Sequence, residues 1–374
     1  MTRAPIFIGN EIYRRSRYGD RHPLAIPRVS AVMDLCRALG WMDEARYIES
    51  RVATREELQV FHRPDYVDAL VRAERGETLS LDERRRYNIG LNGNPIFREI
   101  FSRPATACGA TLTAVELLAA EEGVVYSPAG GTHHGRPGHA SGFCYLNDPA
   151  IGLLAFLERG FERVLYLDID AHHCDGVQDA FHGDPRILTV SIHEAGRWPN
   201  TGPAHDTAGG SALNLPVAPG FNDTEMAYLH DEVVIPVIER FQPQVLFLQT
   251  GADALAEDPL SKLDLSNNAI WEVVRAVVPM VPRCLVVGGG GYNPWSVARC
   301  WTGIWGILNG HVIPDTLDGA AENFLRSLTW ARAAGRAPPT HWFTTLRDAP
   351  RPGQLRQTTH DLAAEARLRF RAGL

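Results

Sequence analysis

The sequence predicts an α/β fold built on one parallel sheet. Short apolar runs alternate with helical patterns of ten or more residues, and this alternation is typical of parallel strands joined by crossover helices. The runs at 164–167 and 245–248 are continuously apolar, as expected for strands that are covered on both faces. Polar residues follow such runs repeatedly, and in open α/β sheets ligands bind at the carboxyl ends of the strands. A functional site is therefore expected along that edge of the sheet.

The expected elements follow one another regularly from residue 105 onward. Strands are predicted at 6–8, 123–126, 163–168, 187–191, 245–249 and 284–287. The spacing of apolar residues predicts helices at 28–39, 55–72, 105–120, 150–158, 225–241, 267–281, 295–308 and 359–372, the second of them broken near Pro64. The segments 79–95, 128–142 and 198–210 are predicted as loops. No change in composition divides the chain, so one domain spanning 1–374 is expected.

Composition argues against several classes of protein. The formal net charge of −7 disfavours a nucleic-acid-binding surface, which needs a basic face. The six cysteines are scattered and form no C-x-x-C pair, which is typical of reduced intracellular thiols. The N-terminus has no apolar segment of the kind found in signal peptides, and no run of about eighteen apolar residues is present that could span a membrane. A cytoplasmic protein is therefore expected, and its oligomeric state, a homo-oligomer included, is left open.

The segment 165–175 carries the strongest chemical signal. Asp168, Asp170 and His172 alternate at period two, which in an extended chain puts the three side chains on the same side. Carboxylate oxygens and an imidazole nitrogen suit a borderline divalent cation such as zinc. A catalytic zinc takes three protein ligands. Asp170 and His172 would be two of them, and Asp253, which follows a later strand, is the best candidate for the third.

Other strand ends supply groups that a hydrolytic metal site needs. The His133-His134 pair could provide a general base, and Tyr292 on a glycine-rich turn could stabilise an oxyanion. Asp168 and Asp175 are placed to serve as carboxylate partners of histidines. Plainer explanations exist: tandem histidines are often ordinary loop residues, and Asp175 could simply cap the helix that follows it. The combination predicts metal-assisted hydrolysis of an amide or ester.

Five segments resemble the zinc-dependent histone deacetylases, and especially their bacterial relatives called acetoin utilization proteins. They are Gly-Gly-Thr-His-His-Gly at 130–135, Ala-Ser-Gly-Phe-Cys-Tyr-Leu-Asn-Asp at 140–148, Tyr-Leu-Asp-Ile-Asp-Ala-His-His-Cys-Asp at 166–175, Gln-Thr-Gly-Ala-Asp at 249–253 and Gly-Gly-Gly-Gly-Tyr-Asn at 288–293. The resemblance covers about 5–310. It implies an arginase-like open sandwich with an eight-stranded parallel sheet. Residues 311–374 would then be a C-terminal extension that packs on this core.

The resemblance also implies a site, position by position. The implied activity is the removal of an acyl group from lysine, with acetyl-lysine in a protein or peptide as the substrate. The implied zinc ligands are Asp170, His172 and Asp253, and ferrous iron could serve instead in the cell. The implied catalytic residues are His133 and His134, their carboxylate partners Asp168 and Asp175, and Tyr292, which donates to the substrate carbonyl. The implied channel residues are Gly142, Phe143, Trp198 and Leu260, and a structural potassium ion is matched to Asp168, Asp170, His172, Ser191 and Ile192.

Departures from the family pattern bear on the substrate. Polyamine deacetylases of the family carry a Glu where this chain has Leu260, which argues against a cationic polyamine. The rim loop 88–95 has no Asp of the kind that eukaryotic relatives use to hold the substrate backbone, so a small acylated amine is the alternative substrate. A non-catalytic acyl-binding module is a third hypothesis, and the intact Tyr292 argues against it. His-Pro-Leu at 22–24 and Arg28 resemble the N-terminal motif of the bacterial relatives, and this resemblance implies that Arg28 lines an internal channel for released acetate.

Overall fold

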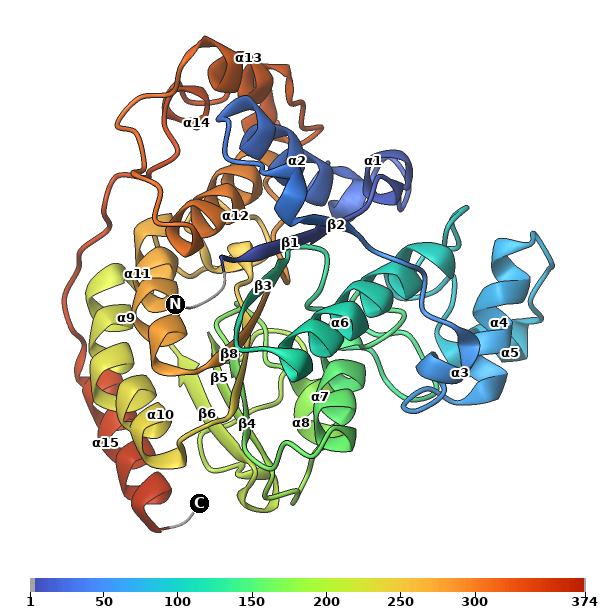
Figure 1. Ribbon diagram of the computed structural model, residues 1–374, viewed down its shortest axis with the longest axis horizontal. Helices are drawn as coiled ribbons and strands as arrows, with labels where there is room; N and C mark the ends of the chain where they lie inside the picture. Colours follow the sequence, from blue (N-terminus) through green and yellow to red (C-terminus); the bar gives the residue numbers. More distant parts are fainter. Residues whose placement is uncertain (1–3, 373–374) are drawn as a thin grey trace.

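One eight-stranded sheet runs through the computed structural model, which describes residues 4–372 (Figure 1). The strand order is β2-β1-β3-β8-β7-β4-β5-β6, and every neighbouring pair is parallel. The strands are β1 (Ile6–Gly9), β2 (Tyr47–Glu49), β3 (Gly123–Ser127), β4 (Val164–Asp168), β5 (Ile187–Glu194), β6 (Ala212–Val217), β7 (Val245–Gln249) and β8 (Arg283–Val287). The predicted α/β fold with a parallel sheet is confirmed, as is the eight-stranded sheet that the resemblance implied.

All six predicted strands are present, and the two that the prediction lacks, β2 and β6, form the edges of the sheet. β2 has only three residues. β6 contains Pro216, whose missing N–H is tolerated at an edge but weakens any strand pattern in the sequence. Both strands depend on pairing with a neighbour, β1 or β5, and not on an apolar run of their own.

Helices cover both faces of the sheet (Figure 1). On one face lie α2 (Val29–Ala38), α9 (Asp223–Leu229), α10 (Ile235–Phe241), α11 (Asn267–Val277), α12 (Pro294–Leu308) and α15 (Gln357–Ala372), and on the other lie α6 (Ser102–Ala120) and α7 (Asp148–Glu158). Along β4, Leu165 and Leu167 pack into the first layer, and Val164 and Tyr166 pack into the second. Successive side chains of a strand point to opposite faces. Both faces therefore need apolar residues, which explains the continuous apolar runs.

The prediction of a loop over 79–95 is wrong in part, because the segment contains α5 (Leu81–Tyr87). Ser80 Oγ accepts a hydrogen bond from the backbone N–H of Glu83, and the Glu83 carboxylate accepts one from the backbone N–H of Ser80. This capping box starts a helix even though the segment is polar and contains few apolar residues. The helix ends at Asn88, which adopts the left-handed conformation with φ +52°, and the loop begins there.

The other helices depart from the prediction mainly at their ends. α3 (Arg55–Leu58) and α4 (Pro64–Glu74) are separated near Pro64, as predicted. The predicted helix at 225–241 is divided into α9 and α10 by a π-helical turn at 230–234. α8 (Asp175–Ala180) is short, and α1 (Ile12–Arg15), α13 (Gly319–Ser327) and α14 (His341–Thr344) lie outside the predicted helices.

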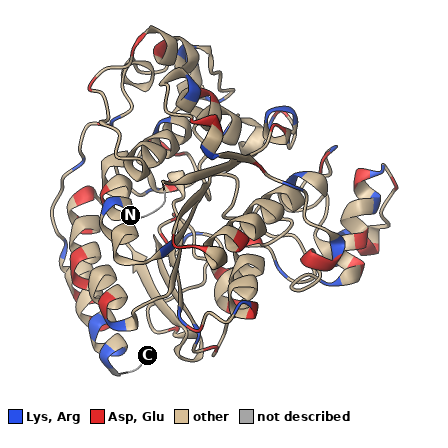
Figure 2. Cartoon of the chain, in the orientation of Figure 1, with Lys and Arg blue, Asp and Glu red and all other residues tan. Residues whose placement is uncertain are grey.

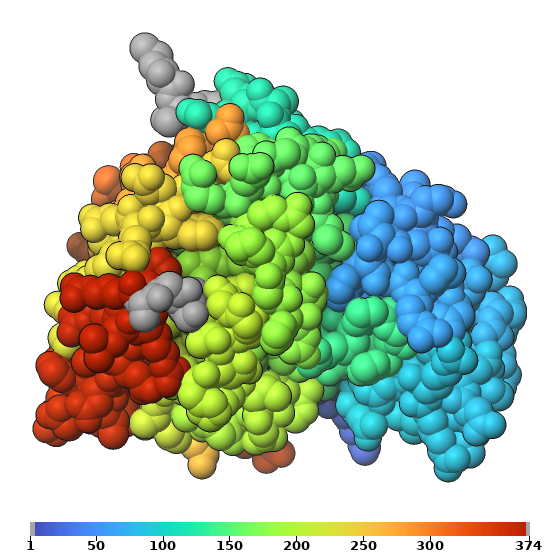
Figure 3. All heavy atoms as spheres, turned by 90° about the horizontal axis from the view of Figure 1, so that it is seen from below, coloured from blue at the N-terminus to red at the C-terminus, as the bar shows by residue number. Residues whose placement is uncertain are grey.

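The C-terminal segment returns to the sheet edge. α15 packs against β6 and α9, and Figure 3 shows it in red beside the yellow and yellow-green segments. Arg356, just before α15, donates to both carboxylate oxygens of buried Glu225 on α9, at 2.7 and 2.6 Å. The Thr359 hydroxyl donates to the same carboxylate at 2.6 Å. The division of one domain into a core ending near residue 310 and an extension stays a prediction.

Charged residues lie mostly on the outer helices and loops, and few lie on the strands (Figure 2). Exceptions are the buried acids Asp168, Asp170 and Asp253, at or beyond the carboxyl ends of β4 and β7. Within residues 4–372 no helix is long and apolar enough to cross a membrane. These three buried acids thus lie at one edge of the sheet.

Candidate active site

Four neighbouring strands bring the predicted site residues together. β3, β8, β7 and β4 are adjacent in the sheet, so the loops that follow their carboxyl ends meet in one place. In the order of the strands, these loops carry His133 and His134, then Tyr292, then Asp253, and then Asp170 and His172. Each of these residues is less than a tenth exposed. Strand order therefore assembles a buried site from segments that are far apart in the chain.

Asp170, His172 and Asp253 form a cluster whose donor atoms fit a divalent metal ion. One donor atom of each lies within 4.8 Å of the others. His172 Nδ1 is 2.9 Å from Asp253 Oδ2 and 3.3 Å from Asp170 Oδ1. Burial and the neighbouring Asp170 carboxylate raise the pKa of Asp253. A cation bound among these groups would offset the repulsion between the two carboxylates. Two carboxylates and one imidazole are a donor set that suits zinc.

Backbone amides fix the direction of both carboxylates. The N–H of Gly290 donates to Asp170 Oδ2 at 2.6 Å, and the N–H of Ala171 donates to Asp253 Oδ1 at 3.0 Å. A Cβ added at Gly290 would lie 1.9 Å from Asp253 Oδ2. Only glycine therefore allows the turn after β8 to approach the cluster this closely.

Each of the tandem histidines has its own carboxylate partner. His133 Nδ1 lies 2.7 Å from Asp168 Oδ2, His134 Nδ1 lies 2.6 Å from Asp175 Oδ1, and the two Nε2 atoms are 2.9 Å apart. Burial lowers the pKa of His133, but the charges of Asp168 and Asp170 outweigh it and raise the pKa to about 9. Burial and the positive charge of His133 lower the pKa of His134 to about 3. His133 is therefore the charged member of the pair and His134 the neutral one, and Asp168 faces His133 instead of the three-residue cluster.

Tyr292 reaches the site from the glycine-rich turn after β8. Its side chain is buried, and its ring lies edge-on to that of Phe143, with 6.0 Å between the centroids. The backbone N–H of Tyr292 donates to Asp258 Oδ2 at 2.6 Å. Asp258 Oδ1 also accepts from the N–H of Leu260 at 2.9 Å. Asp258 therefore connects the turn that carries Tyr292 with the loop that carries Leu260.

A pocket that opens at the exposed Trp198 reaches His134 and Tyr292. The four predicted channel residues Gly142, Phe143, Trp198 and Leu260 all line it. The rings of Trp198 and His134 are 4.6 Å apart, so the aromatic wall and the histidine are in contact. Gly142 has φ +53°, and a Cβ added there would lie 2.4 Å from the Trp198 ring and 2.6 Å from the His134 ring. The structure thus brings these four residues together around one passage.

The rim of this pocket is polar but contributes no carboxylate to the lining within the described residues. Asn88, Asn92, Ser141 and Arg197 line its outer part. Arg197 is already paired with the carboxylate of Glu194, at 2.8 Å for each of two hydrogen bonds. The rim therefore offers amide and hydroxyl groups to a substrate, with no acidic anchor.

Comparison with known proteins establishes the family. The sequence profile of the histone deacetylase domain matches residues 22–308. The chain belongs to the histone deacetylase family. It is 35% identical to Histone deacetylase 8 of Xenopus tropicalis over 76% of this chain and 79% of that protein. It is 33% identical to acetoin utilization protein AcuC of Bacillus subtilis (strain 168), over 83% of this chain and 85% of that protein.

Solved structures of an HDAC homologue share the fold of this histone deacetylase family member. The crystal structure of the HDAC homologue from Aquifex aeolicus has a TM-score of 0.92 and 37% identity, covering 97% of this chain and 100% of that chain. A structure of an HDAC homologue complexed with SAHA has the same scores. The predicted resemblance to histone deacetylases and acetoin utilization proteins is confirmed.

Two buried acids of this histone deacetylase homologue support the site in roles that the sequence analysis did not assign to them. Asp148 accepts from the backbone N–H groups of Gly131 at 3.1 Å and Thr132 at 2.9 Å, and so fixes the loop that presents the tandem histidines. In the sequence it is the last residue of the segment 140–148 that resembles the family, with no role of its own. Asp258 precedes a proline and appears only as a turn residue. Contacts with distant segments give both residues their roles.

The residues matched to a potassium ion lie close together at two paired strands. Asp168 on β4 is opposite Ser191 on β5, Ile192 is the next residue of β5, and Asp170 and His172 follow β4. All five side chains are buried. Their role as potassium ligands stays a prediction.

Proposed function

We propose that this chain is a metal-dependent deacylase that hydrolyses the amide of acetyl-lysine in proteins or peptides. The observation that carries the proposal is the convergence of a three-donor cluster, a neutral histidine and a tyrosine at the inner end of one pocket. Membership of the histone deacetylase family supports deacetylation as the activity.

Asp170, His172 and Asp253 would hold the metal ion, which is zinc or, in the cell, ferrous iron. When bound, such an ion polarises the substrate carbonyl and lowers the pKa of water. A potassium ion held near Asp168 and Ser191 would be structural.

The histidine pair moves the protons. His134, which burial keeps neutral, takes the proton of the attacking water at Nε2 as a general base. Asp175 accepts the Nδ1–H of His134, so it keeps Nε2 directed into the pocket and stabilises the cation that forms. The proton then passes to the leaving amine nitrogen as the C–N bond breaks. His133, charged and held by Asp168, limits how strongly His134 retains the proton.

Tyr292 acts as the donor to the oxygen of the substrate carbonyl. Burial and the nearby carboxylates raise the pKa of Tyr292 well above its ordinary value, so the hydroxyl keeps its proton at neutral pH. A donor that is already in place when charge develops on the oxygen needs no reorganisation. Phe143 and Trp198 would enclose the apolar stem of the acyl-lysine side chain.

The rim favours a second candidate substrate, a small acylated amine. Because no carboxylate lines the pocket within the described residues, nothing acidic anchors a peptide backbone. Leu260 likewise offers no charge to a polyamine. A non-catalytic acyl-binding module would need neither a neutral base nor a protonated tyrosine, so the presence of His134 and Tyr292 in one pocket argues against it.

The proposal is tested by hydrolysis of acetyl-lysine peptides by purified protein before and after metal removal. We expect activity to disappear on chelation and to return with Zn²⁺ or Fe²⁺. Tyr292→Phe should lower kcat by about 10²- to 10³-fold without unfolding the protein. Full activity in metal-free protein contradicts the proposal, and peptide binding without turnover favours the binding module. A comparison of kcat/KM on acetylated proteins and on small acylated amines separates the two substrate classes.

A further inference from the structure

The turn that carries Phe143 into the channel wall has a strained backbone. Ser141 and Cys144 exchange two backbone hydrogen bonds, at 3.0 and 2.8 Å, so Gly142 and Phe143 are the central residues of a two-residue turn. Both have positive φ, +53° and +68°, as a type I′ turn requires. Glycine and asparagine favour this conformation, whereas a bulky aromatic residue rarely adopts it. Contacts from outside the turn are therefore needed to hold Phe143 in place.

Asn94, in the rim loop 88–95, supplies one of these contacts. Its Oδ1 accepts a hydrogen bond from the backbone N–H of Phe143 at 2.9 Å. Within the described residues this N–H has no other acceptor. Asn94 is 1% exposed, so the hydrogen bond is shielded from water. An N–H that loses its only acceptor in such a place destabilises the arrangement that contains it. The turn around Phe143 thus depends on the Asn94 oxygen.

The other half of the Asn94 amide does not reach the substrate passage. Asn94 lines neither the channel pocket nor the inner cavity behind it. Its Nδ2 is sealed from solvent and has no hydrogen-bond partner among residues 4–372. A buried donor without a partner is unusual in a folded protein. The reverse orientation of the amide would turn this donor toward the N–H of Phe143, so the need for an acceptor there explains why Nδ2 is left unpaired.

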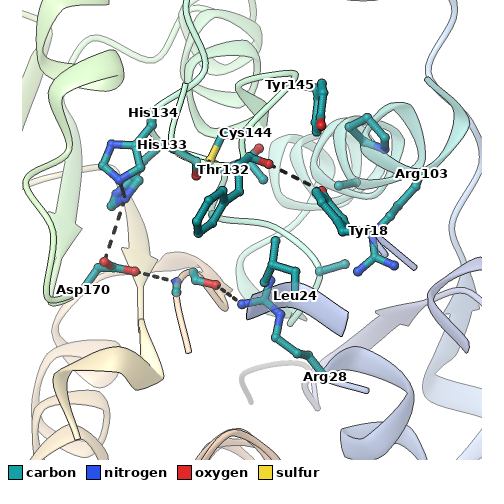
Figure 4. A pocket seen from close by; sticks show the side chains of 18 of the residues that line it. Tyr18, Leu24, Arg28, Arg103, Thr132, His133, His134, Cys144, Tyr145 and Asp170 are labelled. Carbon is teal, nitrogen blue, oxygen red and sulfur yellow. Dashed lines mark hydrogen bonds and ion pairs between the residues drawn. The ribbon is translucent and has the colours of Figure 1, made fainter. Parts of the chain in front are cut away.

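The ring and the carbonyl group of Phe143 are held from other directions. A Cβ added at Gly93 would lie 2.8 Å from the Phe143 ring, so the backbone of the rim loop runs directly against that ring. His22 donates through Nε2 to the carbonyl oxygen of Gly93 at 3.0 Å, and its ring meets that of Phe143 edge-on at 4.6 Å. The Tyr18 hydroxyl lies 3.5 Å from the carbonyl oxygen of Phe143, and Figure 4 shows Tyr18 pointing toward Cys144, the last residue of the turn.

We infer that Asn94 is a positioning residue that fixes Phe143 in the channel wall, and that the rim loop selects substrates through this wall instead of through their peptide backbone. The inference rests on the proposed function, because the position of Phe143 affects turnover only when the stem of an acyl-lysine lies beside it. Asn94 directs its only paired side-chain atom to the wall. The polar rim loop therefore has a role in this chain that needs no acidic residue.

Loss of the Asn94 acceptor should release the turn in most molecules of the free protein. A ligand that needs the intact turn then binds with an affinity reduced by the fraction of molecules that keep it. Saturating substrate restores the turn, so KM should rise while kcat changes little. The factor should be the same for every substrate that has the same stem, whether or not it carries a peptide backbone.

The test uses the metal-loaded full chain and two substrates with the same stem, an acetyl-lysine peptide and N-pentylacetamide, which has no peptide backbone. Where hydrolysis of N-pentylacetamide is slow, its inhibition constant against the peptide replaces KM. Asn94→Leu removes the acceptor at similar size, and we expect KM to rise about tenfold for both substrates. Asn94→Asp keeps an acceptor oxygen and removes the unpaired amide donor, so both KM values should stay close to wild type.

Asn309→Leu is the matched control. Asn309 is also partly shielded from water, and its Oδ1 accepts a hydrogen bond from Arg46 at 2.8 Å. It lines neither the channel pocket nor the inner cavity. Its replacement should leave both KM values unchanged, and a thermal melt shows whether each variant folds. An increase in KM for Asn309→Leu equal to that for Asn94→Leu overturns the inference, because a general loss of stability then explains both.

A double-mutant cycle tests whether Asn94 acts through Phe143. In Phe143→Ala the aromatic wall is already lost, so the addition of Asn94→Leu should raise KM little further. Independent effects of the two substitutions, which would multiply, overturn the inference. A defect of Asn94→Leu that is confined to the peptide also overturns it, because Asn94 then serves the substrate backbone. A folded Asn94→Asp variant as impaired as Asn94→Leu has the same consequence.

Hydrogen exchange distinguishes failure of this inference from failure of the proposed function, because it needs no activity. Mass spectrometry of the segment 140–145 should show slow exchange of the Phe143 N–H in wild type and in Asn94→Asp, and faster exchange in Asn94→Leu. If no acetyl-lysine is hydrolysed, the proposed function fails, and these rates alone decide whether Asn94 holds the turn. If hydrolysis is intact and the rates are equal in wild type and Asn94→Leu, only this inference fails. If Asn94→Leu does not fold, fast exchange of Phe143 in wild type overturns the inference, and slow exchange together with an active Asn94→Asp supports it.

Discussion

The backbone N–H of Tyr292 donates to Asp258 Oδ2 across 2.6 Å. Asp258 lies in the loop that begins with Asp253, so the segment that supplies the third proposed metal ligand also holds the turn that carries the tyrosine. Its other carboxylate oxygen accepts from the N–H of Leu260 on the channel wall. One side chain therefore fixes the tyrosine turn relative to the metal cluster and the channel.

Asp258→Asn should lower kcat for acetyl-lysine hydrolysis about tenfold and change KM little. The amide keeps one acceptor oxygen but turns an NH₂ group toward the second backbone N–H, and an unsatisfied buried donor costs about 1–3 kcal/mol. Steady-state kinetics and a thermal melt measure the effect. Asp264→Asn, at a half-exposed position of the same loop, is the control. An Asp258→Asn variant with wild-type kcat contradicts a positioning role.

Gly142→Ala should lower kcat/KM by about tenfold or more, because a 1 Å displacement near the chemistry can cost about 10²-fold. The new Cβ would lie 2.4 Å from the Trp198 ring and 2.6 Å from the His134 ring. Gly160→Ala is the matched control, since Gly160 also has a positive φ (+85°) but nothing within 4 Å of its Cβ position. Both variants share the cost of a left-handed alanine, about 1–2 kcal/mol. Equal activity losses in the two variants would show that steric contact in the channel is not the cause.

Zn²⁺ should stabilise the metal-free protein through Asp253 and not through Asp168. At a free concentration 100 times Kd, an ion that binds only the folded state adds about 2.7 kcal/mol, which raises Tm by several degrees. Asp253→Asn removes a donor of the cluster and should abolish this shift. Asp168→Asn should keep the Zn²⁺ shift but reduce activity, because Asp168 supports His133. Differential scanning fluorimetry distinguishes the two variants, and loss of the shift in both contradicts this assignment.

The ion pair between Glu225 and Arg356 should make stability depend on pH below about 4.3, the ordinary pKa of glutamate. Burial opposes ionisation of Glu225, but hydrogen bonds from Arg356 and Thr359 outweigh it and lower the pKa of the carboxyl. The stabilisation is therefore present above the ordinary pKa and is lost as pH falls through the lower, folded-state pKa.

Glu225→Gln should reduce the free energy of unfolding by about 1.5–3 kcal/mol at pH 7, the contribution of hydrogen bonds to a charged group. The difference from wild type should shrink as pH falls below about 4.3, because the unfolded chain then takes up a proton that the native carboxylate does not. Urea denaturation at several pH values measures both effects. Glu365→Gln, at an exposed position of α15, should change stability little at any pH. A Glu225→Gln difference that stays constant from pH 7 to pH 3.5 contradicts the argument.

The fold class was predictable because it depends on local properties of the chain. A strand that is covered on both faces needs consecutive apolar residues, and β4 and β7 have them. The candidate metal donors and histidines were predictable for a similar reason, since polar residues at the carboxyl ends of such strands have few structural explanations. β2 and β6 were not predicted, because an edge strand is defined by the neighbour with which it pairs. The helix α5 was not predicted, because the only sequence feature that indicates it is a capping box in a polar segment.

The sequence by itself determined that a parallel sheet would present aspartates, histidines and a tyrosine at its carboxyl edge. The tertiary structure decided the distances and the partners with which they meet. It turned Asp168 toward His133, although its period-two spacing groups it with Asp170 and His172. It also placed Arg28 and Arg103 in the lining of one cavity and Asp258 beside Tyr292. These contacts depend on the strand order and on the packing of the loops. Strand order and loop packing leave no periodic pattern in the sequence, because residues that are distant in the chain become neighbours only when the sheet is assembled.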